Sequence, residues 1–253
     1  MLYLITDLYI LVEFTMHLHS ILMLSIISVI QLHCASIPQS SLFKIEDKTL
    51  TFNTSPGSNC ATLPNNFDHI AFMVDDLDQS IEDFQKLGFS VSEKMSHVNE
   101  KTYNALIRFE DQSYLELISF KEGSFKEFIN FLRRLGIASI FSPSLPPLKR
   151  RFYNLYISTS HKVTYALKVI DSKKWTNLSK SMNQEPFKMT RVDGNKKIEW
   201  EILVPEDPKK SFYIHDLTSY PRASIFKVHP NGIYKISQLC FDKEGYVKSV
   251  VFD

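Results

Sequence analysis

The chain has 253 residues, enough for one large domain or two small modules with a buried core. Its hydrophobic content of 44% and charged content of 23% are typical of a folded protein. A formal net charge of +1, scattered basic residues and only seven glycines give no case for nucleic-acid binding or for a glycine-rich phosphate loop.

Residues 1–36 do not look like part of a globular fold. Residues 21–30 are apolar except for serines, and small residues follow up to Ser36, which is typical of a signal peptide and its cleavage site. An uncleaved membrane anchor is the alternative, and initiation at Met16 instead of Met1 would give a more usual signal length. We therefore expect a secreted or membrane-anchored protein.

Residues 37–66 are rich in Ser, Thr, Asn and Pro, and we expect them to form a flexible lead-in. After a cut at Ser36, two cysteines would remain, Cys60 and Cys240. The sequence leaves open whether they form a disulfide or stay as free, buried thiols.

Residues 67–123 have the pattern of a βαβββ module. Residues 67–74 are strand-like, Asp75 and Asp76 can cap a helix, and Gly88 is suited to end it. Three strands are then expected at residues 89–95, 103–110 and 113–120.

Glu116 stands out in the last of these strands. Strand alternation places it on the same face as Tyr114 and Ile118, and a carboxylate buried among apolar side chains needs a cation, a donor or solvent. His69, in the first strand, is the other residue able to bind a metal or move a proton. Structural alternatives are a pairing of Glu116 with Arg108 and a hydrogen bond from His69 to the backbone.

Residues 124–162 are expected to connect two modules. Residues 124–136 form an amphipathic helix whose apolar stripe should pack across the modules: Phe125, Phe128, Ile129, Leu132 and Leu135. Residues 142–147 predict a stiff, proline-rich linker. The basic run at 149–151 is expected to be a solvated part of it.

The same pattern repeats in residues 163–253, which predicts a second, diverged βαβββ module with additional strands at its end. Where the first module has His69, the second offers Thr164 or Tyr165. At the position of Glu116 it offers Ile214 or His215, because a slip of one residue reverses the face of a strand.

The first module resembles the glyoxalase-like domain of the vicinal oxygen chelate superfamily. The resemblance is carried by DHIAFMVDDLDQS at residues 68–80, by Gly88-Phe89, and by the run from His97 to Leu117; residues 229–232 also resemble the family. It implies an α+β fold in which two paired βαβββ modules form a cleft-shaped, partly open mixed β-barrel with helices outside.

The resemblance also implies a divalent metal, Zn, Mn, Fe or Ni, in the cleft between the modules. His69 and Glu116 would project together as metal ligands, and His215 is a candidate third, since catalytic metals usually have three protein ligands. The other candidates are Glu116 and His97 as catalytic residues and Thr102, Asn104 and His229 as ligand-binding residues. Thr102 and Asn104 could instead fix the preceding loop.

Two functions fit these observations. One is a metal-dependent lyase of glyoxalase type, or a dioxygenase, acting on a small molecule with adjacent oxygens. The other is a non-catalytic, metal-free module that binds a small ligand on the same fold. A homodimer is compatible with either.

Overall fold

The computed structural model describes residues 43–52, 59–96, 101–193, 196–218 and 229–253. The expected signal or anchor at residues 1–36 and the candidate residue His97 lie outside these ranges. Residues 41–253 form a compact unit by themselves, distinct from residues 1–40. Within the described ranges, no helix has both the length and the apolar character needed to cross a membrane.

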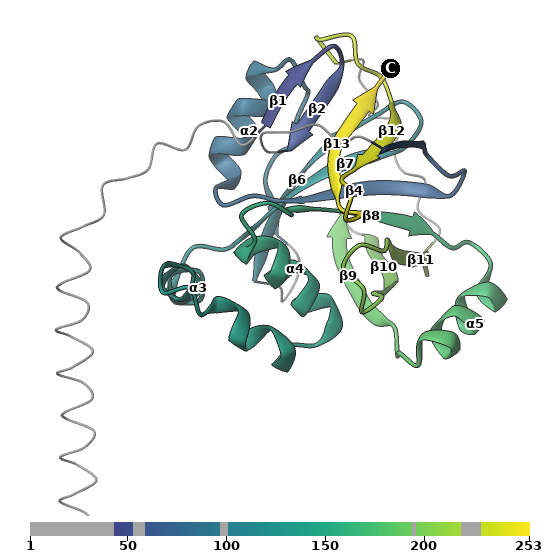
Figure 1. The fold of residues 1–253 in the computed structure, drawn as a ribbon. Helices are drawn as coiled ribbons and strands as arrows, with labels where there is room; N and C mark the ends of the chain where they lie inside the picture. The colour runs from purple at the N-terminus through teal and green to yellow at the C-terminus, as the bar shows by residue number, and fades with distance from the viewer. Residues whose placement is uncertain (1–42, 53–58, 97–100, 194–195, 219–228) are drawn as a thin grey trace, which may run out of the picture. The chain divides into compact units, whose positions relative to one another are not determined.

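The larger of two sheets has eight strands (Figure 1). They are β4 (Phe67–Met73), β5 (Met95–Ser96), β6 (Thr102–Arg108), β7 (Tyr114–Phe120), β8 (Val163–Lys168), β9 (Phe187–Asp193), β10 (Lys196–Leu203) and β11 (Phe212–Asp216). Their order in the sheet is β5-β6-β7-β4-β8-β11-β10-β9. Strands β4 and β8 pair antiparallel at the centre, while β4 pairs with β7, and β8 with β11, in parallel. The predicted α+β fold of two paired βαβββ modules is therefore confirmed.

Matching helices follow the first strand of each module. Helix α2 (Leu77–Lys86) begins after Asp76, whose carboxylate accepts a hydrogen bond of 3.0 Å from the Gln79 N–H. Helix α5 (Ser172–Met182) begins after Asp171, which accepts from the Lys174 N–H at 2.8 Å. Each cap satisfies a helix N–H that otherwise has no partner. Because Asp76 and Asp171 hold the same position in the two modules, they define which residues of the first strands correspond to each other.

The smaller sheet corrects two expectations. It contains β1 (Phe43–Glu46), β2 (Thr49–Phe52), β3 (Asn59–Thr62), β12 (Ile236–Phe241) and β13 (Val247–Phe252), in the order β1-β2-β13-β12-β3. Described residues of the expected flexible lead-in thus form strands, and the last two strands leave the second module to join them. The cause is apolar burial, because Leu50 and Phe52 alternate with threonines and enter the same core as Val250 and Phe252.

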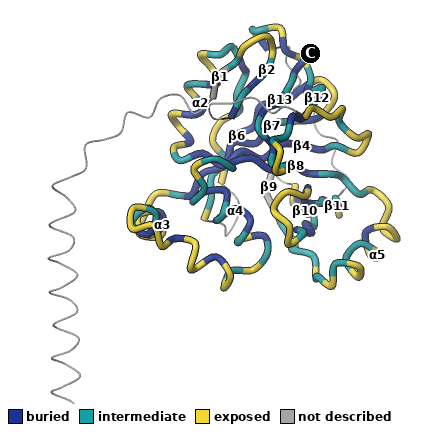
Figure 2. The backbone as a smooth tube through the Cα atoms, in the orientation of Figure 1, coloured by how far each residue is buried: buried dark blue, intermediate teal, exposed yellow. Residues whose placement is uncertain are grey.

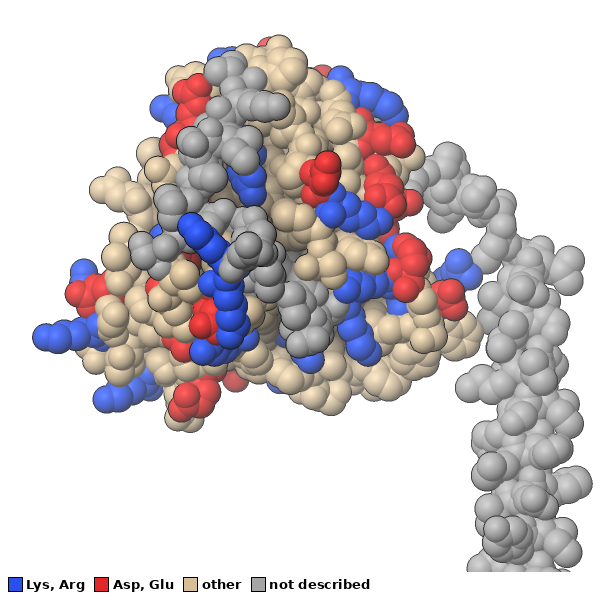
Figure 3. Space-filling view, turned by 180° about the vertical axis from the view of Figure 1, so that it is seen from behind, with Lys and Arg blue, Asp and Glu red and all other residues tan. Residues whose placement is uncertain are grey.

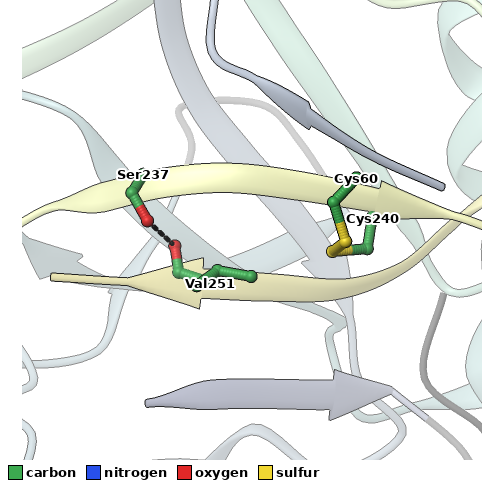
Figure 4. The surroundings of a disulfide bond; sticks show 4 residues. All are labelled: Cys60, Ser237, Cys240 and Val251. Atoms are coloured by element: carbon green, nitrogen blue, oxygen red, sulfur yellow. Dashed lines mark hydrogen bonds between the residues drawn. A yellow bond between two sulfur atoms is a disulfide. The ribbon is translucent and has the colours of Figure 1, made fainter. Parts of the chain in front are cut away.

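A disulfide joins Cys60 and Cys240, which settles the alternative left open by the sequence (Figure 4). The two residues face each other where β3 pairs with β12. Every residue of β3 is exposed, so the strand buries little apolar surface of its own. Backbone pairing and the disulfide are therefore what hold β3 on the sheet.

The buried residues of the described ranges form two cores on opposite faces of the larger sheet, since the neighbours Phe72 and Met73 of β4 belong to different cores. Much of this sheet is coloured as buried in Figure 2. The first is formed by the first module, α2 and the smaller sheet. The second is covered by α3 (Ser124–Arg134) and α4 (Pro147–Ile157), and the 3₁₀ helix η1 (Ala138–Ser144) packs against these two helices. Residues of both modules, such as Met73 and Ile214, pack in this second core with Tyr156 of α4.

Helix α4 corrects the expectation of a solvated linker at residues 149–151. Arg151 is only 4% exposed, and its guanidinium donates to Thr164 Oγ1 and to four carbonyl oxygens between β10 and β11. Burial lowers the pKa of Arg151 to about 10. The arginine is thus an internal tie that fixes α4 across the second module.

Candidate functional site

The concave face of the first module brings His69 and Glu116 together. The pairing of β4 with β7 sets His69 beside Tyr114 and Ala71 beside Glu116. His69 Nε2 lies 3.5 Å from Glu116 Oε2. The imidazole is 3% exposed and the glutamate 9%, so the two groups meet in a largely buried position that borders the surface at the carboxylate.

A further polar side chain orients each member of the pair by binding the ring nitrogen or carboxylate oxygen that does not face the other member. His69 Nδ1 lies 2.7 Å from Asp68 Oδ2, and Asn104 Nδ2 donates to Glu116 Oε1 at 2.6 Å. Because a carboxylate accepts hydrogen bonds, Asp68 fixes the tautomer in which Nδ1 carries the hydrogen and Nε2 faces Glu116. Asn104 leaves Glu116 Oε2 as the oxygen directed at His69.

Aromatic rings fix the plane of the imidazole. The Tyr114 ring stacks on His69 with centroids 4.4 Å apart, and the edge of Phe212 approaches it at 5.4 Å. The roles of Asp68 and Phe212 were not predicted from the sequence. Simple alternation puts Asp68 on the opposite face from His69, but the pairing of β4 with β8 is irregular between Phe67 and His69.

The positions of the second module that correspond to His69 and Glu116 do not form a similar pair. With Asp76 aligned to Asp171, Thr164 takes the place of His69. Ala71 pairs with Glu116, and the equivalent Ala166 pairs with Phe212. Phe212 therefore stands where the first module has Glu116, in place of the expected Ile214 or His215.

The sequence model of one family, described as a glyoxalase-like domain, matches residues 67–244, which is more than half of the chain. The chain belongs to this family. The glyoxalase-like domain is thus shown, within the vicinal oxygen chelate superfamily that the sequence resembles. No curated protein matches the chain.

Several solved structures are similar to this glyoxalase-like domain at low identity. A hypothetical protein from Staphylococcus aureus is 18% identical with a TM-score of 0.43; the match covers 60% of this chain and only 59% of that protein. Methylmalonyl-CoA epimerase from Mycobacterium tuberculosis is 14% identical over 60% of this chain and 86% of that one, with a TM-score of 0.36. The Streptomyces coelicolor epimerase in complex with 2-nitronate-propionyl-CoA is 15% identical over 61% and 98%, with a TM-score of 0.37.

Two candidate histidines of the glyoxalase-like domain lie away from the pair. His215 faces the other side of β11, where Nδ1 lies 2.6 Å from the Val169 carbonyl oxygen and the ring stacks on Trp175. His229 lies in the first core, where Nδ1 accepts from the Ser90 N–H at 2.9 Å. Burial lowers the pKa of His229.

The remaining candidates divide between the site and the undescribed part of the chain. Asn104 belongs to the pair's own hydrogen bonds, and Thr102 lies two residues before it on the same face of β6. His97 is outside the described ranges. Arg108 is also on this face and half-buried, beside Tyr114 in the pairing of β6 with β7.

The donor set falls short of the expected metal centre. His69 and Glu116 supply one nitrogen and one oxygen, whereas Thr164 and Phe212 add no usual ligand from the second module. In the described ranges, no cluster of three or more His, Cys, Asp or Glu residues could hold a metal ion. Catalytic metals usually have three protein ligands, so the described residues provide one too few.

Helix α4 occupies much of the face that the resemblance predicted to be an open cleft. Its Tyr156 packs against residues of both modules in the second core. A separate pocket of about 660 Å³ lies between the two sheets, lined partly by Phe67, Ser113 and Lys235, and none of the candidate residues lines it.

Proposed function

We propose that this glyoxalase-like domain binds a small molecule beside Glu116 and exchanges a proton with it. The observation that carries the proposal is the pair of His69 and Glu116, in which Nε2 and Oε2 lie 3.5 Å apart. Asp68 orients the histidine and Asn104 orients the glutamate. A buried acid–base pair held in one geometry is what general acid–base catalysis needs. The carboxylate also borders the surface, where a small molecule can reach it.

The arrangement assigns a role to each residue. Glu116 Oε2 is the proton-exchanging atom, because Asn104 already binds Oε1. His69 acts as a positioning residue that shares a proton with Oε2. Arg108, half-buried on the same face, places a positive charge where the oxygen atoms of a substrate would lie. A small molecule with adjacent oxygens fits these groups.

Proton exchange can be measured without knowing the natural substrate. Small hydroxycarbonyl and dicarbonyl compounds are incubated with the protein in D₂O, and loss of C–H signals is followed by NMR. We expect exchange by the wild type and a loss of at least about 100-fold in Glu116→Gln, which keeps the shape of the side chain. His215→Gln, on the opposite face, is the matched control and should keep full exchange.

Two outcomes would contradict the catalytic proposal. Equal exchange by Glu116→Gln and the wild type would remove Glu116 from the reaction. Binding of a compound by the wild type, seen as a thermal shift, without exchange of any compound would instead support the non-catalytic binding module.

A metal-dependent lyase or dioxygenase is the second candidate. The observation in its favour is that metal-binding histidines and carboxylates are commonly oriented by outer hydrogen-bond partners, as Asp68 and Asn104 do here. Titration with Zn²⁺, Mn²⁺, Fe²⁺ and Ni²⁺ tests it directly. Stoichiometric binding that disappears in both His69→Ala and Glu116→Ala would support a metal site, and no binding of any of the four would sink it.

We also propose that the protein enters the secretory pathway, as a secreted or membrane-anchored form. The support is the apolar run at residues 21–30 followed by small residues. Expression in cells with a C-terminal tag, followed by N-terminal sequencing, tests this. A mature protein that begins near Ile37 would indicate cleavage, whereas an intact N-terminus in the membrane fraction would indicate an anchor. A full-length chain in the cytosol would contradict both.

A further inference from the structure

The described part of the chain has one concentration of exposed apolar side chains. Six of its nine exposed large hydrophobic residues lie between residues 125 and 141, and each is 37% to 68% exposed. We call this surface the α3–η1 face. Its residues are Phe125, Phe128, Leu135, Ile137, Ile140 and Phe141.

The predicted apolar stripe of α3 is divided between the inside and the outside. Ile129 and Leu132 are buried in the fold, whereas Phe128 and Leu135 point outward. Packing of the whole stripe across the modules, as the sequence indicated, is therefore corrected. The helix has more apolar surface than the rest of the domain covers.

A contact between two aromatic rings joins the two elements of the α3–η1 face. The rings of Phe128 and Phe141 meet edge-to-face with centroids 6.0 Å apart, which joins the helix to η1. Lys101 Nζ lies 4.4 Å from the centre of the Phe125 ring at one end. Single exposed apolar residues are ordinary, but six of them on two elements that contact each other indicate a binding surface.

The surrounding chain is strongly basic. Residues 121–151 contain seven Lys or Arg and two Asp or Glu, a formal charge of +5 in a chain whose total is +1. Part of this charge is used internally, since Arg151 is buried, Arg133 pairs with Asp75, and Lys126 is buried and pairs with Glu122. Arg134 and Lys149 are exposed. On the face of the molecule in Figure 3, acidic and basic side chains are intermingled.

We propose that the α3–η1 face docks onto an anionic lipid bilayer. Phe128, Ile140 and Phe141 would enter the headgroup region, and exposed basic side chains such as Lys149 would meet lipid phosphates. The basic charge argues against a second copy as the occupant. A two-fold symmetric dimer would bring the same basic surfaces face to face, where like charges repel.

Vesicle binding tests the proposal with residues 41–253. This compact unit contains both cores and the disulfide but none of the apolar run at residues 21–30. Flotation is measured with phosphatidylcholine vesicles with and without phosphatidylserine. We expect binding to the anionic vesicles, weakened by salt, and at least about tenfold weaker binding by a Phe128→Glu, Ile140→Glu double variant. Lys149→Ala should weaken binding about fivefold.

Ile170→Glu is the matched control, because Ile170 is 80% exposed between β8 and α5, outside the α3–η1 face. It should bind vesicles as the wild type does, and thermal melting should show that all variants are folded. An equal loss in the control and the double variant would overturn the proposal. A failure of the wild type to bind anionic vesicles would also overturn it. The proposal would equally be wrong if the wild type did not bind vesicles but formed a dimer that is lost in the double variant.

Discussion

Replacing Arg151 by methionine tests the tie between α4 and the second module. Methionine keeps much of the side-chain volume but removes all five hydrogen bonds of the guanidinium. Two of the acceptors, Thr164 Oγ1 and the Pro205 carbonyl, lie in buried or half-buried residues, and each costs about 1–3 kcal/mol when left unpaired. The other three belong to exposed residues that water can reach.

These contributions give an expected loss of about 3–5 kcal/mol in the free energy of unfolding, since the three exposed bonds add less than about 1 kcal/mol each. Urea unfolding followed by circular dichroism would show a midpoint lowered by roughly 1–2 M. Lys149→Met, two residues earlier on the exposed side of α4, should change stability by less than about 0.5 kcal/mol. A loss below about 1 kcal/mol in Arg151→Met would refute the reasoning.

Three further predictions concern the first module and the smaller sheet. Burial lowers the pKa of His229 below its ordinary 6.5, so just below pH 6.5 the unfolded state binds more protons than the folded state does. The melting temperature of the protein should therefore fall as the pH drops through this range, and it should fall less in His229→Asn. Cys60→Ser removes a disulfide that spans 180 residues and should cost roughly 3–5 kcal/mol in urea unfolding, a loss that adding reductant to the wild type should reproduce. Gly88→Ala puts a Cβ 2.9 Å from the Cβ of Asn231, at a φ of +82°. The matched control is Gly232→Ala, where φ is +76° and nothing lies within 4 Å of the added Cβ. Gly88→Ala should lower the free energy of unfolding by about 1–3 kcal/mol more than the control does, and equal losses would exclude the close approach as the cause.

Local patterns predicted the two modules because their signals are local. Asp76 and Asp171 each begin a helix after an apolar strand, and alternation in β7 placed Glu116 on a defined face. The likeness of the first module to the glyoxalase-like family supplied the expectation that His69 would meet it. The helix caps and the strand alternation depend on residues a few positions apart, so a single sequence is enough to find them.

What escaped prediction depends on distant or irregular contacts. The smaller sheet joins β2 to β13 across almost the whole described chain. Strands at the end of the chain were expected, but their pairing with β2 had no local sign beyond the alternation of Leu50 and Phe52. Helix α4 begins with Pro147, a residue favoured at the first position of a helix, but the prolines before it were interpreted as a linker. The register of β11 depends on its pairing with β8, so Phe212 could not be placed from sequence.

The smaller sheet combines strands from the beginning and the end of the described chain, which affects the order of folding during synthesis. Strands β1, β2 and β3 leave the ribosome before the first module, whereas β12 and β13 follow both modules. Until those two strands arrive, β3 and the β1–β2 hairpin have no sheet to join, and Cys60 has no partner. The apolar face carrying Phe72 therefore stays partly uncovered while most of the chain is made. A nascent chain stalled before β12 should thus be a substrate for chaperones even though both of its modules are complete.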